Sequence, residues 1–361
     1  MNAHLIRLYR YELPLARPLH LRDKVLTHRS GLLLRFGYGE EKEAGYGDIA
    51  PLPGFSGETL EEAQEAVVRW SKLLGHLPKS EPERGEALDF LAQTPSVQFG
   101  IECATFQFRH AIGSTRRLGL FSAARKRVSV NGLLSGTLEE VVDHAQVLRN
   151  SGYRAAKLKV GRQDPEKDIE MIREVHRVFS GVPLRLDANR AWDFDTAVAV
   201  SRGIAGCEIE YIEEPLITPE RLEEFVRRTG APVALDESVV EFGVKNVFLQ
   251  SRQWAKAVII KPTLLGGIMG CEKLAYEALE FGLKPVVSSC FESGVGLAAL
   301  AHLASAITSE DIPVGLDTYD WLAADVLPRR FSVRNGVLDL DEVDTCVAAL
   351  DPGALECVYY D

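Results

Sequence analysis

Several features that would assign this chain to a special class are missing. No run of 18 apolar residues occurs in its 361 residues, so nothing predicts a membrane-spanning helix. The 41 Lys and Arg are outnumbered by 52 Asp and Glu and are scattered, so nucleic acid would gain little from binding here. The six cysteines show no CxxC spacing, and we interpret them as reduced, buried thiols. These absences leave an ordinary soluble globular protein.

The amino-terminal segment also lacks a targeting signal. MNAHLIRLYRYELPL alternates apolar and polar residues like a strand and has no apolar core or small-residue cleavage site of a secretory signal. We therefore expect a cytoplasmic protein without membrane association. Eight histidines are present, but none lies at the end of the strands that are predicted below for residues 126–321. Their absence there disfavours zinc hydrolases and Ser-His-Asp enzymes.

What is present is a series of charged residues at nearly even intervals, each at the end of a short apolar run. The intervals are 23 to 28 residues, about the length of one strand, one helix and two short loops. The series consists of Lys159, Asp187, Glu213, Asp236 and Lys261. This period predicts an α/β fold built as a (β/α) barrel, in which residues at the carboxyl ends of the strands surround one mouth.

Strand and helix patterns alternate strictly from about residue 126 to residue 321. Eight candidate strands end near Asn131, Lys159, Asp187, Glu213, Asp236, Lys261, Ser288 and Leu316. Residues 1–53 instead read as antiparallel strands with a hairpin around Gly39 to Lys42, followed by helices. We therefore predict an α+β capping domain over 1–125, the barrel over 126–321, and a segment over 322–361 that packs back on the cap.

The order of the strands determines which charged groups can meet. Lys159 on the second strand and Lys261 on the sixth lie opposite each other across the barrel. Asp187, Glu213 and Asp236 come from strands three to five and repel one another unless a cation intervenes. Because all three are oxygen donors, the pattern favours Mg²⁺ over Zn²⁺. A metal between two lysines suits removal of a proton from carbon next to a carboxylate, which predicts a small-molecule carboxylate substrate.

Two further basic residues stand two positions before members of the series. Lys157 precedes Lys159 and points to the same side of its strand, so its charge should lower the pKa of Lys159, and we also expect it to bind the substrate. Arg185 stands in the same relation to Asp187, where it would orient that carboxylate or contact the substrate. A single lysine at a strand end is usually only solvated, and a non-catalytic barrel scaffold is the alternative. Five charged residues in phase with the repeat favour an enzyme.

The motifs KLK, LDAN followed by RAW, YIEEP, LDES and IIKPTLLGG resemble the muconate lactonizing subgroup of the enolase superfamily. Members of this superfamily use a Lys or His base with Mg²⁺. The resemblance extends over both predicted domains, through segments such as GYGDIAPLPGFSGETLEEA and PSVQFGIECA. It implies an enolase-type barrel with an amino-terminal capping domain and a dehydratase that acts on a cyclohexadiene carboxylate.

By position, the resemblance implies roles for individual residues. Lys159 would be the general base, and Lys261 would stabilise the enediolate from the other face of the ring. Asp187, Glu213 and Asp236 would bind Mg²⁺, whereas Glu214 should point away from the site. We expect the turn from Ser288 to Gly296, with Ser288 and Ser289, to hold a second carboxylate of the substrate, although a plain strand-to-helix turn explains it equally well.

The same resemblance also implies a rival activity and a lid. Two opposed lysines can deliver a proton to either face, so a racemase of N-succinylated amino acids or a dipeptide epimerase is the alternative. Dipeptide epimerases of this subgroup carry Asp-x-Asp at the eighth strand end, where this chain has Asp317 and Asp320 three positions apart. The loops over 17–27 and 51–56 would close over the mouth and exclude water.

Overall fold

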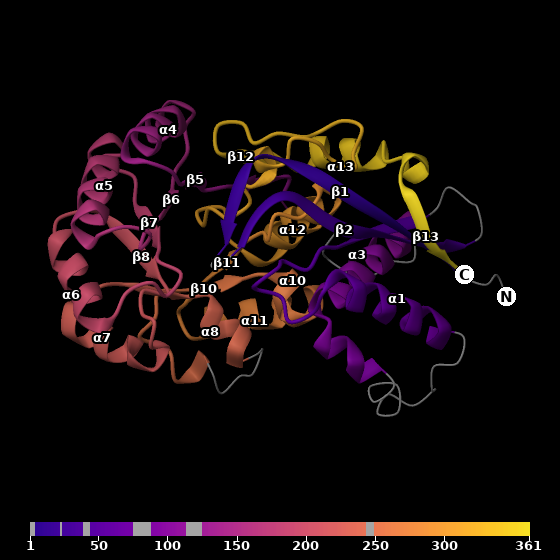
Figure 1. Ribbon diagram of the computed structural model, residues 1–361, viewed down its shortest axis with the longest axis horizontal. Coiled ribbons are helices and arrows are strands. Elements are labelled where there is room, and N and C mark those ends of the chain that lie inside the picture. Colours follow the sequence, from indigo (N-terminus) through magenta and orange to yellow (C-terminus); the bar gives the residue numbers. More distant parts are fainter. Residues whose placement is uncertain (1–3, 22–23, 39–43, 75–87, 113–124, 243–248) are drawn as a thin grey trace.

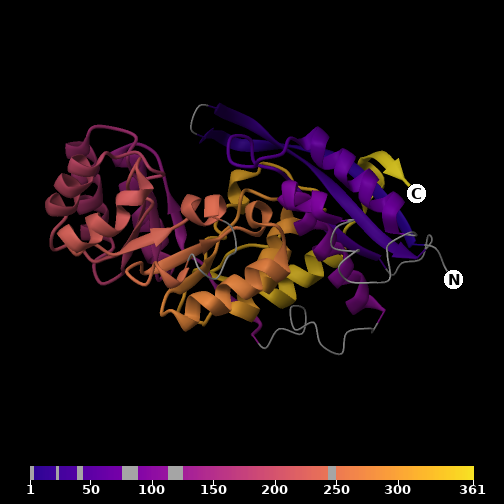
Figure 2. The same cartoon turned by 90° about the horizontal axis from the view of Figure 1, so that it is seen from below.

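The computed structural model describes residues 4–21, 24–38, 44–74, 88–112, 125–242 and 249–361 (Figure 1). Two sheets dominate it. An antiparallel sheet lies with two helices at one end of the molecule, and a parallel sheet lies with its covering helices at the other (Figure 2). Within the described residues, no helix is both long and apolar enough to cross a membrane.

The antiparallel sheet forms the cap. Its strand order is β13-β1-β2-β3, and its bounds are β1 His4–Leu21, β2 Lys24–Tyr38, β3 Ala44–Ile49 and β13 Glu356–Tyr360. The predicted hairpin is confirmed by the pairing of Gly37 with Ala44, while its turn at Gly39 to Lys42 lies outside the described residues. Two helices, α1 Leu60–Leu74 and α3 Pro95–Ala111, cover one face of this sheet (Figure 1).

Glycines let α3 lie directly on β3. A Cβ atom at Gly45 would be 1.8 Å from the carbonyl oxygen of Ala104, and one at Gly47 would be 1.8 Å from that of Gly100. No real side chain tolerates such a contact, so only glycine permits this approach of backbone to backbone. The motif GYGD is therefore explained by packing within the cap.

The parallel sheet curls through seven strands in sequence order, so each strand neighbours the next in the chain. These are β5 Gly132–Leu134, β6 Ala156–Lys159, β7 Leu184–Asp187, β8 Ile209–Glu213, β9 Val233–Leu235, β10 Ala257–Ile260 and β11 Lys284–Val287. The predicted eighth strand is reduced to two bridges, Val130 with Val314 and Ser288 with Gly315. They link the segment at 314–315 to both edges of the sheet. The fold is thus an α/β fold of the curled, barrel-like type.

Helices follow the strands, and those after β5, β6, β7 and β8 cover the outer face of this sheet (Figure 1). Their bounds are α4 Leu138–Asn150, α5 Pro165–Val178, α6 Phe194–Gly203, α7 Leu222–Thr229, α8 Glu237–Phe242, α10 Pro262–Leu265, α11 Ile268–Glu280 and α12 Gly294–Ile307. Proline and glycine mark two of the helix ends: Pro165 begins α5, and Gly230 ends α7 in a left-handed conformation with φ 70°.

The carboxyl-terminal segment connects the two sheets. Its first strand, β12 Val337–Asp339, pairs with β4 Arg127–Ser129. Strand β4 stands in the chain just before β5, the first strand of the parallel sheet. Helix α13 Leu340–Ala348 then packs on α12, and β13 pairs antiparallel with β1 at the edge of the cap sheet. Both figures show β13 at the end of the molecule far from α5, α6 and α7.

Candidate active site

The five charged residues of the series lie at the carboxyl ends of consecutive parallel strands. Direct strand pairing places Lys159 beside Asp187 and Asp187 beside Glu213. Asp236 directly follows β9 and Lys261 directly follows β10. The three carboxylates are almost completely buried, with exposed fractions of 0 to 1%. Burial of three like charges in one place requires positive partners.

Lysine side chains supply those partners in this structure. The ammonium nitrogen Nζ of Lys157 lies 2.7 Å from both Asp187 Oδ2 and Glu213 Oε1. Lys159 Nζ donates to Asp187 Oδ2 at 2.6 Å and to Asn189 Oδ1 at 2.9 Å. On the other side of the ring, Lys261 is paired with Asp236. Every predicted acidic member of the ring is therefore in contact with a lysine.

The two lysines at the ends of the series differ in their electrostatic surroundings. Burial lowers the pKa of Lys159, and the neighbouring charge of Lys157 adds to this effect against the opposing charge of Asp187. Burial also disfavours charge on Lys261, but the carboxylate of Asp236 outweighs it and raises the pKa of Lys261. Lys159 thus gives up a proton more readily than Lys261 does.

The pKa values of the acidic residues reflect burial, repulsion between the carboxylates and attraction to the lysines. Burial raises the pKa of Glu213, and the charges of Asp187 and Asp236 raise it further. Burial opposes charge on Asp187 as well, but Lys157 and Lys159 lower its pKa. Three buried carboxylates that lie close together offer several oxygen donors, and a hard divalent cation would offset their mutual repulsion.

The residues fit such a cation by chemistry and number, but their present contacts would have to open. Among the residues that the structure describes, no group of three or more His, Cys, Asp or Glu side chains is arranged to hold a metal ion. The reason is visible in the ion pairs, since each carboxylate is turned toward an ammonium group. A divalent cation bound by these carboxylates would take the place of the ammonium groups that contact them here.

A small cavity of about 80 Å³ lies beside the lysines of the ring, and none of the three carboxylates lines it. Lys159 and Lys261 both line it, so the two opposed amines face one shared space. Its full lining is Leu21, Leu52, Phe55, Asn131, Leu133, Lys157, Lys159, Asn189, Lys261, Leu264, Ser288, Ser289, Cys290, Phe291, Gly315, Asp317 and Thr318. A larger cleft of about 780 Å³ shares Leu133, Lys159 and Phe291 with this cavity and leads outward.

The cap closes the cavity with apolar side chains. The predicted lid loop 17–27 is corrected here, because residues 17–21 belong to β1 and residues 24–27 to β2. Leu21 at the end of β1 lines the cavity, as do Leu52 and Phe55 of the loop 51–56. Leu21 and Leu52 pack with Leu264 and Trp321 in a separate apolar cluster between the cap and the barrel-like sheet. Such a cluster excludes water from the lysines. Residues 22 and 23 of the first loop lie outside the described part of the chain.

The predicted serines line the cavity as well. Ser288 and Ser289 are each 7% exposed and follow β11. The hydroxyl of Ser289 lies 2.6 Å from that of Thr318, and Ser288 donates weakly to the carbonyl of Gly315 at 3.4 Å. Both residues line the cavity, and their role in holding a substrate carboxylate stays a prediction.

Arg185 does not contact the cavity, which corrects the prediction that it binds the substrate directly. Its guanidinium is fully buried and pairs with Glu210 at 2.7 Å, beneath the ring. It also donates to Asn131 Oδ1 at 2.9 Å and to the carbonyl of Pro313 at 2.5 Å. Arg185 lies two positions before the end of β7, and Glu210 lies three positions before the end of β8. Both are therefore farther than Asp187 and Glu213 from the strand ends that form the site.

Two residues near the ring were missed or undervalued by the sequence analysis. Asn189 accepts a hydrogen bond from Lys159 and donates one to Glu237 Oε1 at 3.2 Å, so it orients the lysine. Glu214 does not enter the cavity, as expected, but its buried carboxylate binds the backbone at Asp236. The motifs LDAN and YIEEP contain both residues, but adjacency in sequence does not reveal these contacts.

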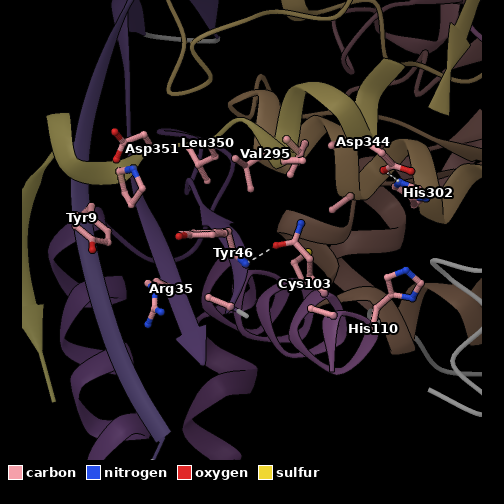
Figure 3. Close-up of a pocket in the computed structure, with 18 of the residues that line it drawn as sticks. Tyr9, Arg35, Tyr46, Cys103, His110, Val295, His302, Asp344, Leu350 and Asp351 are labelled. Atoms are coloured by element: carbon pink, nitrogen blue, oxygen red, sulfur yellow. Dashed lines mark hydrogen bonds and ion pairs between the residues drawn. The ribbon is translucent and has the colours of Figure 1, made fainter. Parts of the chain in front are cut away.

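A larger cavity lies elsewhere in the described part of the chain. It measures about 830 Å³ and lies between the cap sheet, α3, α12 and α13 (Figure 3). Figure 3 shows Arg35 and Tyr46 on the cap side and the ion pair of His302 with Asp344 on the helix side. None of the five ring residues lines it. The candidate active site is therefore the small cavity at the strand ends.

Fold and site together define an enzyme of the enolase type. A sequence profile described as "Enolase C-terminal domain-like" matches residues 140–344, and one described as "MenC, N-terminal domain" matches residues 3–108. The solved structure of a substrate-liganded L-Ala-D/L-Glu epimerase from Bacillus subtilis is 25% identical, with a TM-score of 0.79, and the match covers 92% of this chain and 95% of that one.

A further solved structure shows the same fold with metal bound. It is a dipeptide epimerase from Methylococcus capsulatus complexed with Mg and dipeptide L-Arg-D-Lys, at a TM-score of 0.75 and 22% identity, covering 93% of this chain and 96% of that one. The o-succinylbenzoate synthase of Haemophilus influenzae is 35% identical over 337 residues, which span 92% of this chain and 95% of that protein. The chain therefore belongs to the o-succinylbenzoate synthase family.

Proposed function

We propose that the protein is a Mg²⁺-dependent o-succinylbenzoate synthase of menaquinone biosynthesis. It would dehydrate 2-succinyl-6-hydroxy-2,4-cyclohexadiene-1-carboxylate to 2-succinylbenzoate. The observation that carries this proposal is the near full-length similarity to a synthase, joined to two opposed lysines that line one cavity. The proposal includes the predicted cytoplasmic location and requires no oligomer.

In the proposed reaction, Lys159 removes the proton on the ring carbon that bears the carboxylate. The same lysine then returns this proton to the departing hydroxyl group, so water leaves and the ring becomes aromatic. A neutral amine is needed for the first step, and the lowered pKa of Lys159 supports that role. Lys261 keeps its charge and stabilises the electron-rich ring from the opposite side.

Asp187, Glu213 and Asp236 would hold the metal. When bound, Mg²⁺ would stabilise negative charge that develops on the substrate carboxylate. Lys157 would remain a cation beside these carboxylates, as its present contacts with Asp187 and Glu213 suggest. Its charge keeps the neighbouring Lys159 easier to deprotonate.

Ser288 and Ser289 would hold the succinyl carboxylate through their hydroxyls, because both line the cavity on the side away from Lys159's strand. Arg185 would support the floor of the site through Glu210 and Asn131 without touching the substrate. The end of β1 that carries Leu21 and the loop that carries Leu52 and Phe55 line the cavity and would move outward to admit the substrate.

We also propose the division into a cap over 1–125, a barrel over 126–321 and a returning segment over 322–361. It is supported by the two profile matches, which fall on either side of residue 125. The pairing of β13 with β1 supports the return of the last segment to the cap.

The dipeptide epimerase alternative has one specific feature against it. Asp317 lines the cavity and accepts a hydrogen bond from Tyr153, whereas the side chain of Asp320 is fully exposed. Only one carboxylate of this pair is therefore available to hold an amino group, where a dipeptide epimerase uses two.

The test is direct. Purified protein with Mg²⁺ should convert the cyclohexadiene carboxylate to 2-succinylbenzoate, chelator should abolish this activity, and added Mg²⁺ should restore it. Indifference to chelator would count against the metal assignment. In parallel, N-succinyl amino acids are incubated in D₂O and followed by NMR. Rapid α-deuteration without any dehydration would replace the synthase by the racemase.

A further inference from the structure

Glu214 is a buried carboxylate that the proposed reaction does not use. It directly follows Glu213, its side chain is 0% exposed, and its backbone is left-handed with φ 40°. A left-handed conformation is unfavourable for glutamate, and burying a charge is costly. Both costs are incurred at one residue beside a predicted metal ligand, which indicates that its position serves a purpose.

Its contacts show what it holds. Oε1 accepts hydrogen bonds from the backbone N–H groups of Asp236 at 3.0 Å and Ser238 at 2.8 Å. Oε2 accepts from Arg190 Nε at 3.0 Å. The carboxylate of Glu214 therefore fixes the backbone of Asp236, the residue whose side chain enters the ring from the next strand.

Arg190 completes the arrangement from the other side. It lies three residues after Asp187, is also left-handed with φ 61°, and its backbone N–H donates to the carbonyl of Glu214 at 2.7 Å. Its guanidinium further donates to Ser238 Oγ at 3.0 Å and to Glu241 Oε2 at 2.9 Å. One ion pair thus ties together the ends of β7, β8 and β9, the three strands that carry the acidic ring residues.

We propose that Glu214 and Arg190 are positioning residues for the metal site, which hold Asp236 at the correct place relative to Glu213 and Asp187. This inference rests on the proposed function, because it assumes that these three carboxylates bind a divalent cation. Groups that orient metal ligands typically change metal affinity about 10- to 100-fold when they are removed. Neither residue lines the cavity, so substituting them removes none of the side chains that would contact the substrate.

The substitution Glu214→Gln separates positioning from simple space filling. The two oxygens of Glu214 face donors on both sides, backbone N–H groups on one and a guanidinium on the other. A glutamine has the same shape but only one acceptor oxygen, so its NH₂ group must face one of these donors. The variant therefore loses either its hold on Asp236 or its pair with Arg190.

The experiment measures Mn²⁺ binding by calorimetry and by electron paramagnetic resonance, together with the metal dependence of turnover. We expect Glu214→Gln to bind Mn²⁺ about 10- to 100-fold more weakly, with much of kcat recovered at saturating metal. Arg190→Lys, which keeps the charge but cannot reach Glu214, Ser238 and Glu241 together, should show a smaller weakening in the same direction. If Glu214→Gln does not fold, Arg190→Lys alone decides the question.

A matched control is the exposed pair of Arg221 with Glu224, whose Nε to Oε2 distance is 2.8 Å. Glu224→Gln should leave Mn²⁺ binding unchanged. Unaltered Mn²⁺ affinity in a folded Glu214→Gln or Arg190→Lys would overturn the inference while leaving the proposed function intact. Failure of the unsubstituted protein to bind either Mn²⁺ or Mg²⁺ would instead remove the proposed metal site itself.

Discussion

The two sides of the cavity carry the same residue in opposite settings. On the β6 side, Lys159 has a second lysine, Lys157, two positions away, and its pKa is lowered by burial and by that charge. On the β10 side, Lys261 faces Asp236, which raises its pKa despite burial. The comparison teaches that neighbouring charges, and not residue type, decide which amine can accept a proton and which remains a cation.

The largest effect is expected on the β6 side. Lys159→Ala and Lys159→Arg should both lower kcat about 10²- to 10⁴-fold, because alanine has no base and a guanidinium stays protonated. Turnover is measured by formation of 2-succinylbenzoate, with circular dichroism as the control for folding. Full activity of either folded variant would refute the assignment of Lys159 as the base.

The same pair of substitutions should behave differently on the β10 side. Lys261→Ala should lower kcat by about 10²- to 10³-fold, the usual loss when an electrostatic partner of the transition state is removed. Lys261→Arg keeps a positive charge and should recover part of this loss. The assignment of the two sides is reversed if arginine is tolerated at 159 and not at 261.

A third prediction concerns the loop after β11. This strand pairs with β10, and its loop is hydrogen-bonded to Asp48 of the cap. Asp48 accepts hydrogen bonds from Tyr11 Oη at 2.6 Å and from the backbone N–H of Ser293 at 2.8 Å. Burial is the main reason that the pKa of Asp48 rises to about 6. The folded protein therefore binds this proton more tightly than the unfolded chain, whose aspartate pKa is about 3.9.

From this shift, the stability contributed by Asp48 is fully present below about pH 4 and is lost as the pH rises through about 6. Asp48→Asn should remove this pH dependence, worth roughly 2–3 kcal/mol at about 1.4 kcal/mol per pKa unit. Urea unfolding at pH 4.5 and pH 7 measures it. An unchanged difference between the two pH values in the variant would contradict the shift.

The smallest effect is expected from a hydroxyl at the cavity wall. Ser288→Ala should raise KM for the substrate up to about 10-fold, the cost of one hydrogen bond, with little change in kcat. Steady-state kinetics separate the two constants. A fall in kcat without any change in KM would show that Ser288 acts on the reaction and not on binding.

Much of the ring was predictable because strand ends are strongly marked in this sequence. Short apolar runs that end in Lys159, Asp187 and Glu213 leave little choice of register, since parallel strands that follow one another align their carboxyl ends. Helix starts such as Pro165 were equally legible. The period of the repeat therefore predicts both the alternation of strands and helices and the position of the charged residues at the strand ends.

The remainder depended on contacts between distant residues. Arg185 turns downward because Glu210, from the next strand, lies beneath it, and the register shifts between Leu184 and Arg185 at this point. The reduced eighth strand reflects bridges at only Val314 and Gly315. Glu214 was undervalued because alternation along a strand predicts that it leaves the cavity, but not that it holds a neighbouring backbone.

The pairing of β13 with β1 has a consequence for biosynthesis. On the ribosome, β1 emerges early, but the strand that covers its outer edge is translated only after the whole of the parallel sheet. Until then the nascent chain presents an open strand edge, which invites association with other chains. Synthesis speed and chaperone supply should therefore affect the yield of this protein more than changes within the parallel sheet's own helices.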